Sequence, residues 1–207
     1  MTTRDVGTPL GPARVRSEDP AAAVAGTLVL GHGAGGGVDS ADLTHVALAA
    51  AGAGWRVLRV EQPWRVAGRR IAPAPPRLDE AWTAVLADLR ATGDLAGPLV
   101  LAGRSAGARV ACRTAAAEGA AGVLALAFPL YPPRKPERSR AAELLAVAVP
   151  LLVVQGETDA LGRPAEVAAA LAGHAGRVVA VPGDHSLRKD PAAVAAAAAG
   201  WLGELSS

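Results

Sequence analysis

The sequence predicts an α/β fold: a doubly wound, mostly parallel sheet of about six to seven strands with helices on both faces and no large cap domain. Two observations lead to this prediction. Short runs rich in valine and leucine alternate with longer alanine-rich segments along the chain, as in parallel strands joined by helical crossovers. These short runs are also apolar at nearly every position, which is typical of strands buried on both faces.

Strands and helices are assigned from this alternation. Six strands are expected, at Thr27–His32, Trp55–Glu61, Pro98–Gly103, Gly122–Phe128, Pro150–Gly156 and Arg177–Val181. Helices are expected at Ser40–Ala51, Leu78–Thr92, Ala106–Glu118, Pro164–Ala172 and Pro191–Leu202. Two of these helices are preceded by typical capping residues: Asp39 or Ser40 at the first helix, and Asp190, followed by Pro191 in the first turn, at the last.

The chain of 207 residues predicts one domain, because a single core suffices at this length. Residues 1–20 form a polar N-terminal segment in which "RVRSE" (residues 14–18) is a candidate antiparallel edge strand, and residues 21–207 form the domain. The proline- and charge-rich segment Pro129–Pro150 stands where a simple crossover helix is expected. No stretch is long enough for a lid domain, so an active site is expected to be open.

Charge and cysteine content restrict the partners. The net charge is only +2 and the arginines are scattered among acids, which argues against nucleic acid as the main partner. One cysteine, Cys112, and an N-terminus without a secretory pattern predict a cytoplasmic protein. No apolar run reaches the roughly 18 to 20 residues of a membrane span, and no metal-ligand spacing appears. We therefore expect no membrane association, no cofactor or metal, and a monomer or homodimer.

The segment "GRSAG", Gly103 to Gly107, matches G-x-S-x-G between a predicted strand and a predicted helix. That context is the one in which such a pentapeptide presents a nucleophilic serine on a sharp turn. Serine and glycine at such junctions also make ordinary helix caps, so the motif alone leaves both readings open. Cys112, about two turns further along, is interpreted as core packing.

A serine hydroxyl needs a base, which is usually a histidine oriented by a carboxylate. His185 follows the last predicted strand, and Asp159 follows the strand before it. The order Ser105, Asp159, His185 is one known for serine hydrolases with a parallel sheet. Glu157 and Asp184 are the competing acids, ranked lower because Asp184 is adjacent to His185 in sequence. Taken alone, each residue has another interpretation: Asp159 as a cap of the next helix, and His185 as a solvated loop residue.

The glycine-rich stretch "GHGAGGG" begins at Gly31 and follows the first predicted core strand. It lacks the ending of a phosphate-binding loop, so we interpret it as an oxyanion hole. In this interpretation the backbone amides of Ala34 and Ala106 hold the developing negative charge. His32 is expected to hold the loop by hydrogen bonding and is also a candidate substrate contact.

These segments together resemble the alpha/beta-hydrolase superfamily. More narrowly, "GHGAGGG", "GRSAGARVA", "LAFPLYPPRKPER", "VQGETDALG" and "GDHSL" resemble its small, capless, dienelactone-hydrolase-like branch, which includes the testis-expressed hydrolase-like proteins. The resemblance covers the chain from Thr27 onward. It implies that fold, a catalytic triad of Ser105, Asp159 and His185, and hydrolase activity of a carboxylesterase or dienelactone-hydrolase kind, but no particular substrate. The antiparallel strands with which the superfamily usually begins are expected to be nearly absent from this short N-terminus.

The function expected is cleavage of a small ester or thioester through an acyl-enzyme on Ser105. Two alternatives remain open: a non-catalytic binding or scaffold protein on the same fold, and an acyltransferase or peptidase using the same triad. Loops after other strands are expected to line the substrate pocket. Their candidate side chains are the apolar Trp64 and Tyr131, together with Arg65, Arg69, Arg70 and Arg104 for an acidic substrate. Alternatively, these arginines form solvated surface ion pairs.

Overall fold

The protein is organised around one twisted sheet, seen in the computed structural model, which describes residues 2–21, 23–135 and 137–206. Within those residues, eight strands run in the order β1-β2-β4-β3-β5-β6-β7-β8. All neighbours from β4 to β8 pair in parallel, whereas β1 pairs with β2, and β2 with β4, in antiparallel fashion. The strands are β1 (Thr2–Val6), β2 (Ala13–Glu18), β3 (Gly26–Gly31), β4 (Trp55–Glu61), β5 (Leu99–Arg104), β6 (Gly122–Leu126), β7 (Leu151–Gly156) and β8 (Arg177–Val181).

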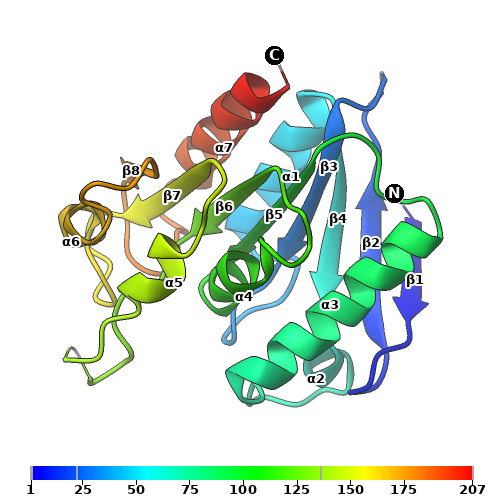
Figure 1. Ribbon diagram of the computed structural model, residues 1–207, viewed down its shortest axis with the longest axis horizontal. Coiled ribbons are helices and arrows are strands. Elements are labelled where there is room, and N and C mark those ends of the chain that lie inside the picture. The colour runs from blue at the N-terminus through cyan, green and yellow to red at the C-terminus, as the bar shows by residue number, and fades with distance from the viewer. Residues whose placement is uncertain (1, 22, 136, 207) are drawn as a thin grey trace.

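Helices cover both faces of this sheet (Figure 1). They are α1 (Ala41–Gly52), α2 (Pro63–Val66), α3 (Pro75–Ala91), α4 (Ala106–Thr114), α5 (Ala141–Leu145), α6 (Pro164–Ala170) and α7 (Pro191–Leu205). On one face α3 and α4 bury one apolar cluster against the sheet, and on the other face α1 and α7 bury a second cluster. The predicted doubly wound architecture is thus confirmed.

The helix pattern explains this packing, as α3 illustrates. Its buried residues recur at spacings of one and three, at Leu78, Ala81, Trp82, Val85, Leu86 and Leu89, which places them on one side of a helix. The helix begins at Pro75, three residues before the predicted start, because a proline fits the first helical turn, where its missing N–H needs no partner. At α7 the predicted start holds, and the Asp190 side chain accepts a hydrogen bond from the Ala193 amide at 2.9 Å.

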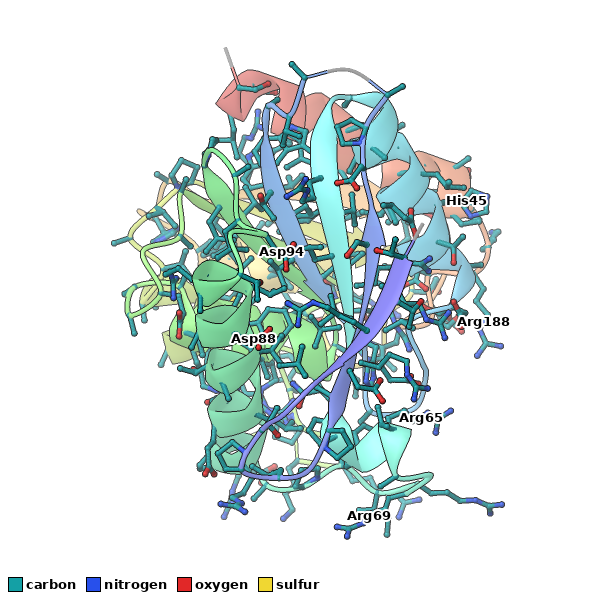
Figure 2. All side chains as sticks on the ribbon, turned by 90° about the vertical axis from the view of Figure 1, so that its right-hand side faces the viewer. His45, Arg65, Arg69, Asp88, Asp94 and Arg188 are labelled. Atoms are coloured by element: carbon teal, nitrogen blue, oxygen red, sulfur yellow. The ribbon has the colours of Figure 1, made fainter. Side chains whose placement is uncertain are left out.

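The candidate strand at residues 14–18 is present as β2 and is antiparallel, as predicted, but β1 pairs outside it at the edge and raises the strand number above the predicted six to seven. Ala13 and Val15 of β2 are fully buried and alternate with half-buried arginines. β1 is polar and mostly exposed, so its sequence carries little apolar signal. Its Arg4 forms ion pairs with Asp88 and Asp94, two acids that Figure 2 shows beside this strand. The antiparallel start, expected to be nearly absent, is therefore present.

The segment Pro129–Pro150 lacks a long crossover helix, as its proline content predicts. The only helix among its described residues is the short α5, while residue 136 lies outside the described chain. The carboxyl ends of β3, β5, β7 and β8 all lie at one edge of the sheet, since these strands are parallel. Each is followed by one of the segments proposed to carry chemistry, so the topology gathers them at that edge.

Candidate active site

Ser105 occupies a strained turn between β5 and α4. Its backbone angles are φ 54° and ψ −108°, in a region that costs a non-glycine residue about 1 to 3 kcal/mol. The Ser105 amide donates a 2.9 Å hydrogen bond to the carbonyl of Leu126 at the end of β6. This contact helps to hold the turn, which is the geometry expected of a nucleophile presented by G-x-S-x-G.

The two glycines of the motif are required by close backbone contacts. A Cβ on Gly103 would lie 2.5 Å from the backbone carbon of Gly107, and a Cβ on Gly107 would lie 2.6 Å from the carbonyl oxygen of Gly31. Both distances are far below van der Waals contact, so a side chain at either position would push β5, α4 and β3 apart. The glycines thus let the serine turn approach the end of the neighbouring strand.

His185 joins the serine to a buried carboxylate. Its Nε2 lies 2.9 Å from the Ser105 Oγ, and its Nδ1 lies 2.8 Å from the Asp159 Oδ2. Because a carboxylate only accepts, Nδ1 carries the proton and Nε2 is left to accept from the serine hydroxyl. The structure therefore brings all three predicted residues into one hydrogen-bonded chain, oriented for removal of the serine proton.

The carboxylate of Asp159 is fully buried and held by three donors. Besides His185, its Oδ2 accepts from the Gln155 Nε2 at 2.8 Å, and its Oδ1 accepts from the Leu161 amide at 2.8 Å. Sequence reasoning missed Gln155, which is fully buried and also contacts the carbonyl of Gly162. The feature of the sequence that could have identified Gln155 is its position as a polar residue near the end of the otherwise apolar strand "LLVVQG".

The two competing acids lie differently. Glu157 is exposed, and the exposed Asp184 accepts hydrogen bonds from the amide and the hydroxyl of Ser186. Those bonds lower the pKa of Asp184. Asp184 thus stabilises the turn that carries His185. The imidazole of His185 is paired with Asp159 instead.

His32 anchors the glycine loop that follows β3. Its Nδ1 lies 2.9 Å from the Gly33 carbonyl, and its Nε2 accepts a 3.1 Å hydrogen bond from the amide of Gln62, just after β4. Burial lowers the pKa of His32, and the positive charges of Arg65 and Arg104 act in the same direction. The neutral ring has both nitrogens engaged by backbone, which fits the loop-holding role and leaves no nitrogen for a substrate.

The two predicted oxyanion amides belong to different segments, Ala106 to the start of α4 and Ala34 to the glycine loop after β3. Ala106 is the first residue of α4, where amides have no acceptor within the helix, and the neighbouring Ser105 amide is already used. Ala34 lies exposed in the turn closed by the 3.3 Å hydrogen bond from the Gly36 amide to the Gly33 carbonyl.

A small apolar cavity lies beside the serine turn. Ala106 and Gly107 form one wall, and the indole of Trp64 contributes to another, with its ring centroid 5.5 Å from that of His32. The free volume is about 10 Å³, which is room for one water-sized group. The remaining lining residues are Gly31, His32, Gln62, Ala72, Leu78, Trp82 and Val110. Trp64 is thus placed where the sequence predicted an apolar wall.

The other predicted substrate contacts lie in different places. Arg65 lines a shallow groove along the glycine loop together with Arg188, and Figure 2 shows both side chains at the surface. Arg69 also projects into solvent in Figure 2, and Arg70 is exposed. Tyr131 is half-buried against the apolar cluster under α3 and α4.

Arg104 differs most from its predicted place. Only 9% of the residue is exposed, and its Nε lies 3.4 Å from the buried carboxylate of Asp42. The guanidinium therefore faces the interior rather than a bound substrate, because its counter-ion lies there.

Further observations concern cysteine, metals and membranes. Cys112 is buried, and burial raises its pKa to about 12, which accords with the core role predicted for it. Among the described residues, no cluster of three or more His, Cys, Asp or Glu side chains is arranged to hold a metal ion. No helix in the described part of the chain is both long and apolar enough to cross a membrane.

Comparisons with known proteins agree with this architecture. The chain matches the family model for the alpha/beta hydrolase domain over residues 24–198, and it therefore belongs to the alpha/beta hydrolase family. No curated protein matches it in sequence.

Solved structures show the same fold at low identity. An alpha-beta serine hydrolase homologue from Coxiella burnetii is 20% identical, with 97% of each chain covered and a TM-score of 0.81. XC6422 from Xanthomonas campestris, an α/β serine hydrolase without a lid, is 21% identical, with 97% of this chain and 94% of that chain covered and a TM-score of 0.75. A dienelactone hydrolase from Anabaena variabilis is 20% identical, with 97% and 95% covered and a TM-score of 0.75. In the described residues of this chain, too, the segments between the strands hold no additional domain, as the sequence predicts.

Proposed function

We propose that this protein is a serine hydrolase that cleaves a small ester or thioester through a covalent acyl-enzyme on Ser105. The observation that carries the proposal is the hydrogen-bonded chain from the Ser105 Oγ through His185 to the buried Asp159. Its setting on a strained strand-to-helix turn, in a member of the alpha/beta hydrolase family, supports the same conclusion.

In the first half of the reaction, the Ser105 Oγ attacks the carbonyl carbon of the ester. The His185 Nε2 takes the hydroxyl proton, and the Asp159 carboxylate stabilises the imidazolium and keeps Nδ1 protonated. When the tetrahedral intermediate collapses, the bond to the leaving alcohol or thiol breaks, and His185 returns the proton to that group. Ser105 is left acylated.

In the second half, water attacks the acyl carbon while His185 accepts one of its protons. Collapse of the second intermediate releases the carboxylic acid and returns the proton to the Ser105 oxygen. In both halves the carbonyl oxygen becomes negatively charged, and the amides of Ala34 and Ala106 are the donors proposed for it. Each such donor contributes about 3 to 4 kcal/mol to stabilising the transition state.

The cavity next to Ala106 and Gly107 supports a small acyl group. Its volume of about 10 Å³ suits a methyl-sized end better than a long chain. Its apolar lining, to which Trp64 and Leu78 contribute, offers little to a charged group. Acetyl and comparably short esters are therefore the substrates we propose.

The direct test is labelling with a fluorophosphonate, which reacts with activated serines. Intact-protein mass spectrometry should show one adduct on the parent protein and none on Ser105→Ala. Ser186→Ala serves as the matched control, because Ser186 lies next to His185 but its hydroxyl bonds Asp184, so this variant should be labelled normally. A folded parent protein that takes no adduct would reject the proposal and favour the scaffold alternative.

Replacing Trp64 by leucine is expected to lengthen the preferred acyl chain. The smaller side chain enlarges the cavity, and each methylene that an apolar pocket accepts or rejects changes kcat/KM by about 10-fold or more. The ratio of kcat/KM for butyrate over acetate p-nitrophenyl esters should therefore rise at least about 10-fold.

Trp201→Leu provides the control for this change. Trp201 is 4% exposed, as against 6% for Trp64, and it packs in the apolar cluster on the other face of the sheet. This variant should lose stability without a change in chain-length preference. Equal ratios for the two variants would mean that the cavity does not hold the acyl group.

A further inference from the structure

Arg104 stands at the variable position of the G-x-S-x-G motif, directly before the proposed nucleophile. It is the last residue of β5, and only 9% of it is exposed. A guanidinium is charged at all ordinary pH values, and burying a charge is costly unless it is paired. The chain keeps this charge beside Ser105, which calls for a physical reason.

The guanidinium lies against the glycine loop. A Cβ on Gly33 would be 3.1 Å from the Arg104 Nη2, and a Cβ on Gly36 would be only 2.6 Å from the same atom. Gly33 and Gly36 are the two ends of the turn that contains Ala34. Arg104 therefore packs against both ends of the turn that contains Ala34. A side chain at Gly33 or Gly36 would crowd its guanidinium.

A buried carboxylate supplies the counter-charge of the guanidinium. Asp42 is fully buried, lies in the first turn of α1, and has its Oδ2 3.4 Å from the Arg104 Nε. Negative charge is favourable at the start of a helix, so Asp42 suits both the helix and the arginine. Because α1 begins soon after the loop, the ion pair links the end of β5 to the segment that follows the Ala34 turn.

We propose that Arg104 is a positioning residue that sets the glycine loop, and with it the Ala34 amide, at the correct distance from Ser105. The inference rests on the proposed function for its kinetic consequence. The placement of the loop itself is measurable without any substrate.

The first test is kinetic, with Arg104→Met and Arg104→Lys. Misplacing an oxyanion donor by about 1 Å is expected to cost about 100-fold, so Arg104→Met should lower kcat for a short ester by about that factor. KM should change less than about 3-fold, because the ground-state carbonyl depends little on the oxyanion hole. Arg104→Lys should recover part of kcat, since it keeps a cation for Asp42 but not the planar fork.

Arg113→Met is the matched control for the loss of a paired arginine. Arg113 lies on α4 and pairs with Asp79 and Glu143, on the face of the sheet away from α1 and Asp42. It should lower thermal stability and leave kcat within about 3-fold of the parent value.

The second test is a double-mutant cycle with Gly36→Ala. The added methyl should displace the guanidinium of Arg104 and lower kcat at least about 10-fold, but it should have little effect in an Arg104→Met background, where the clashing atom is gone. Gly37→Ala is the control, because a Cβ there would meet nothing within 4 Å. Additive effects of Gly36→Ala and Arg104→Met would overturn the inference.

The third test measures the loop directly by amide hydrogen exchange on a peptide that covers residues 31–40. Arg104→Met and Gly36→Ala should both speed exchange there, whereas Arg113→Met should not. Unchanged exchange in the loop, or an Arg104→Met variant with parental kcat, would refute the positioning role even if Ser105 reacts normally. A parent protein that is inert to fluorophosphonate would refute the proposed hydrolase instead, while the exchange result would still decide the role of Arg104.

Discussion

Replacing His185 by alanine is expected to lower kcat for a short ester by about 10⁴- to 10⁶-fold. Without the imidazole, the Ser105 hydroxyl has no base within reach, since the Nε2 that lies 2.9 Å from its Oγ is removed. Steady-state hydrolysis of p-nitrophenyl acetate measures this directly. The loss should not grow when Ser105→Ala is added, because the two residues act as one unit.

His45→Ala is the control for a lost histidine. His45 lies exposed on α1, with its Nδ1 2.8 Å from the carbonyl of Ala41, and Figure 2 shows it at the surface, clear of the sheet. Its removal should leave kcat unchanged. If His185→Ala kept more than about a tenth of the parental rate, a general base at this position would be ruled out.

Replacing Asp159 by asparagine should cost about 10⁴-fold in kcat. The oxygen nearest Leu161 must remain an acceptor for that backbone amide, so the new NH₂ group would face both the His185 Nδ1 and the Gln155 Nε2. These two N–H donors would then face an NH₂ group that cannot accept a hydrogen bond from either. The imidazole is expected to carry its proton on Nε2 instead, where it cannot accept the proton of the serine.

Asp184→Asn and Glu157→Gln test the acid assignment. Both positions are exposed, and Asp184 bonds Ser186, so each variant should keep kcat within about 3-fold of the parent. A large loss at Asp184, together with activity in Asp159→Asn, would move the orienting carboxylate to Asp184. Rates should be compared on protein shown to be folded, because Asp159 is fully buried.

The core of the fold was predictable because it depends on apolar runs. Strands such as β4 and β8 match the prediction to the residue, and the others differ by one or two positions. The exposed β1 was missed because a polar strand at the rim of a sheet takes its conformation from its pairing with β2 and not from its own side chains. Side-chain alternation carries a signal only where one face is buried.

The candidate site was predictable where chain order carries information. Ser105, Asp159 and His185 follow three strands whose ends meet at one edge, so topology alone places them near one another. Gln155 and the partnership of Arg104 with Asp42 depend instead on which side chains meet in three dimensions. No spacing rule connects Asp42 to Arg104, since one strand (β4) and two helices (α2 and α3) lie between α1 and β5.

The N-terminal hairpin also affects how the chain can be shortened. β1 and β2 cover the outer side of β4, yet both lie before residue 24, where the family match begins. A polypeptide trimmed to the matched residues would leave the backbone donors and acceptors of β4 open to solvent, next to fully buried residues such as Val57 and Val60. Such an uncovered strand is a template for intermolecular pairing. We therefore expect a polypeptide trimmed to residues 24–198 to self-associate more readily than the full chain, because β2 no longer pairs with β4.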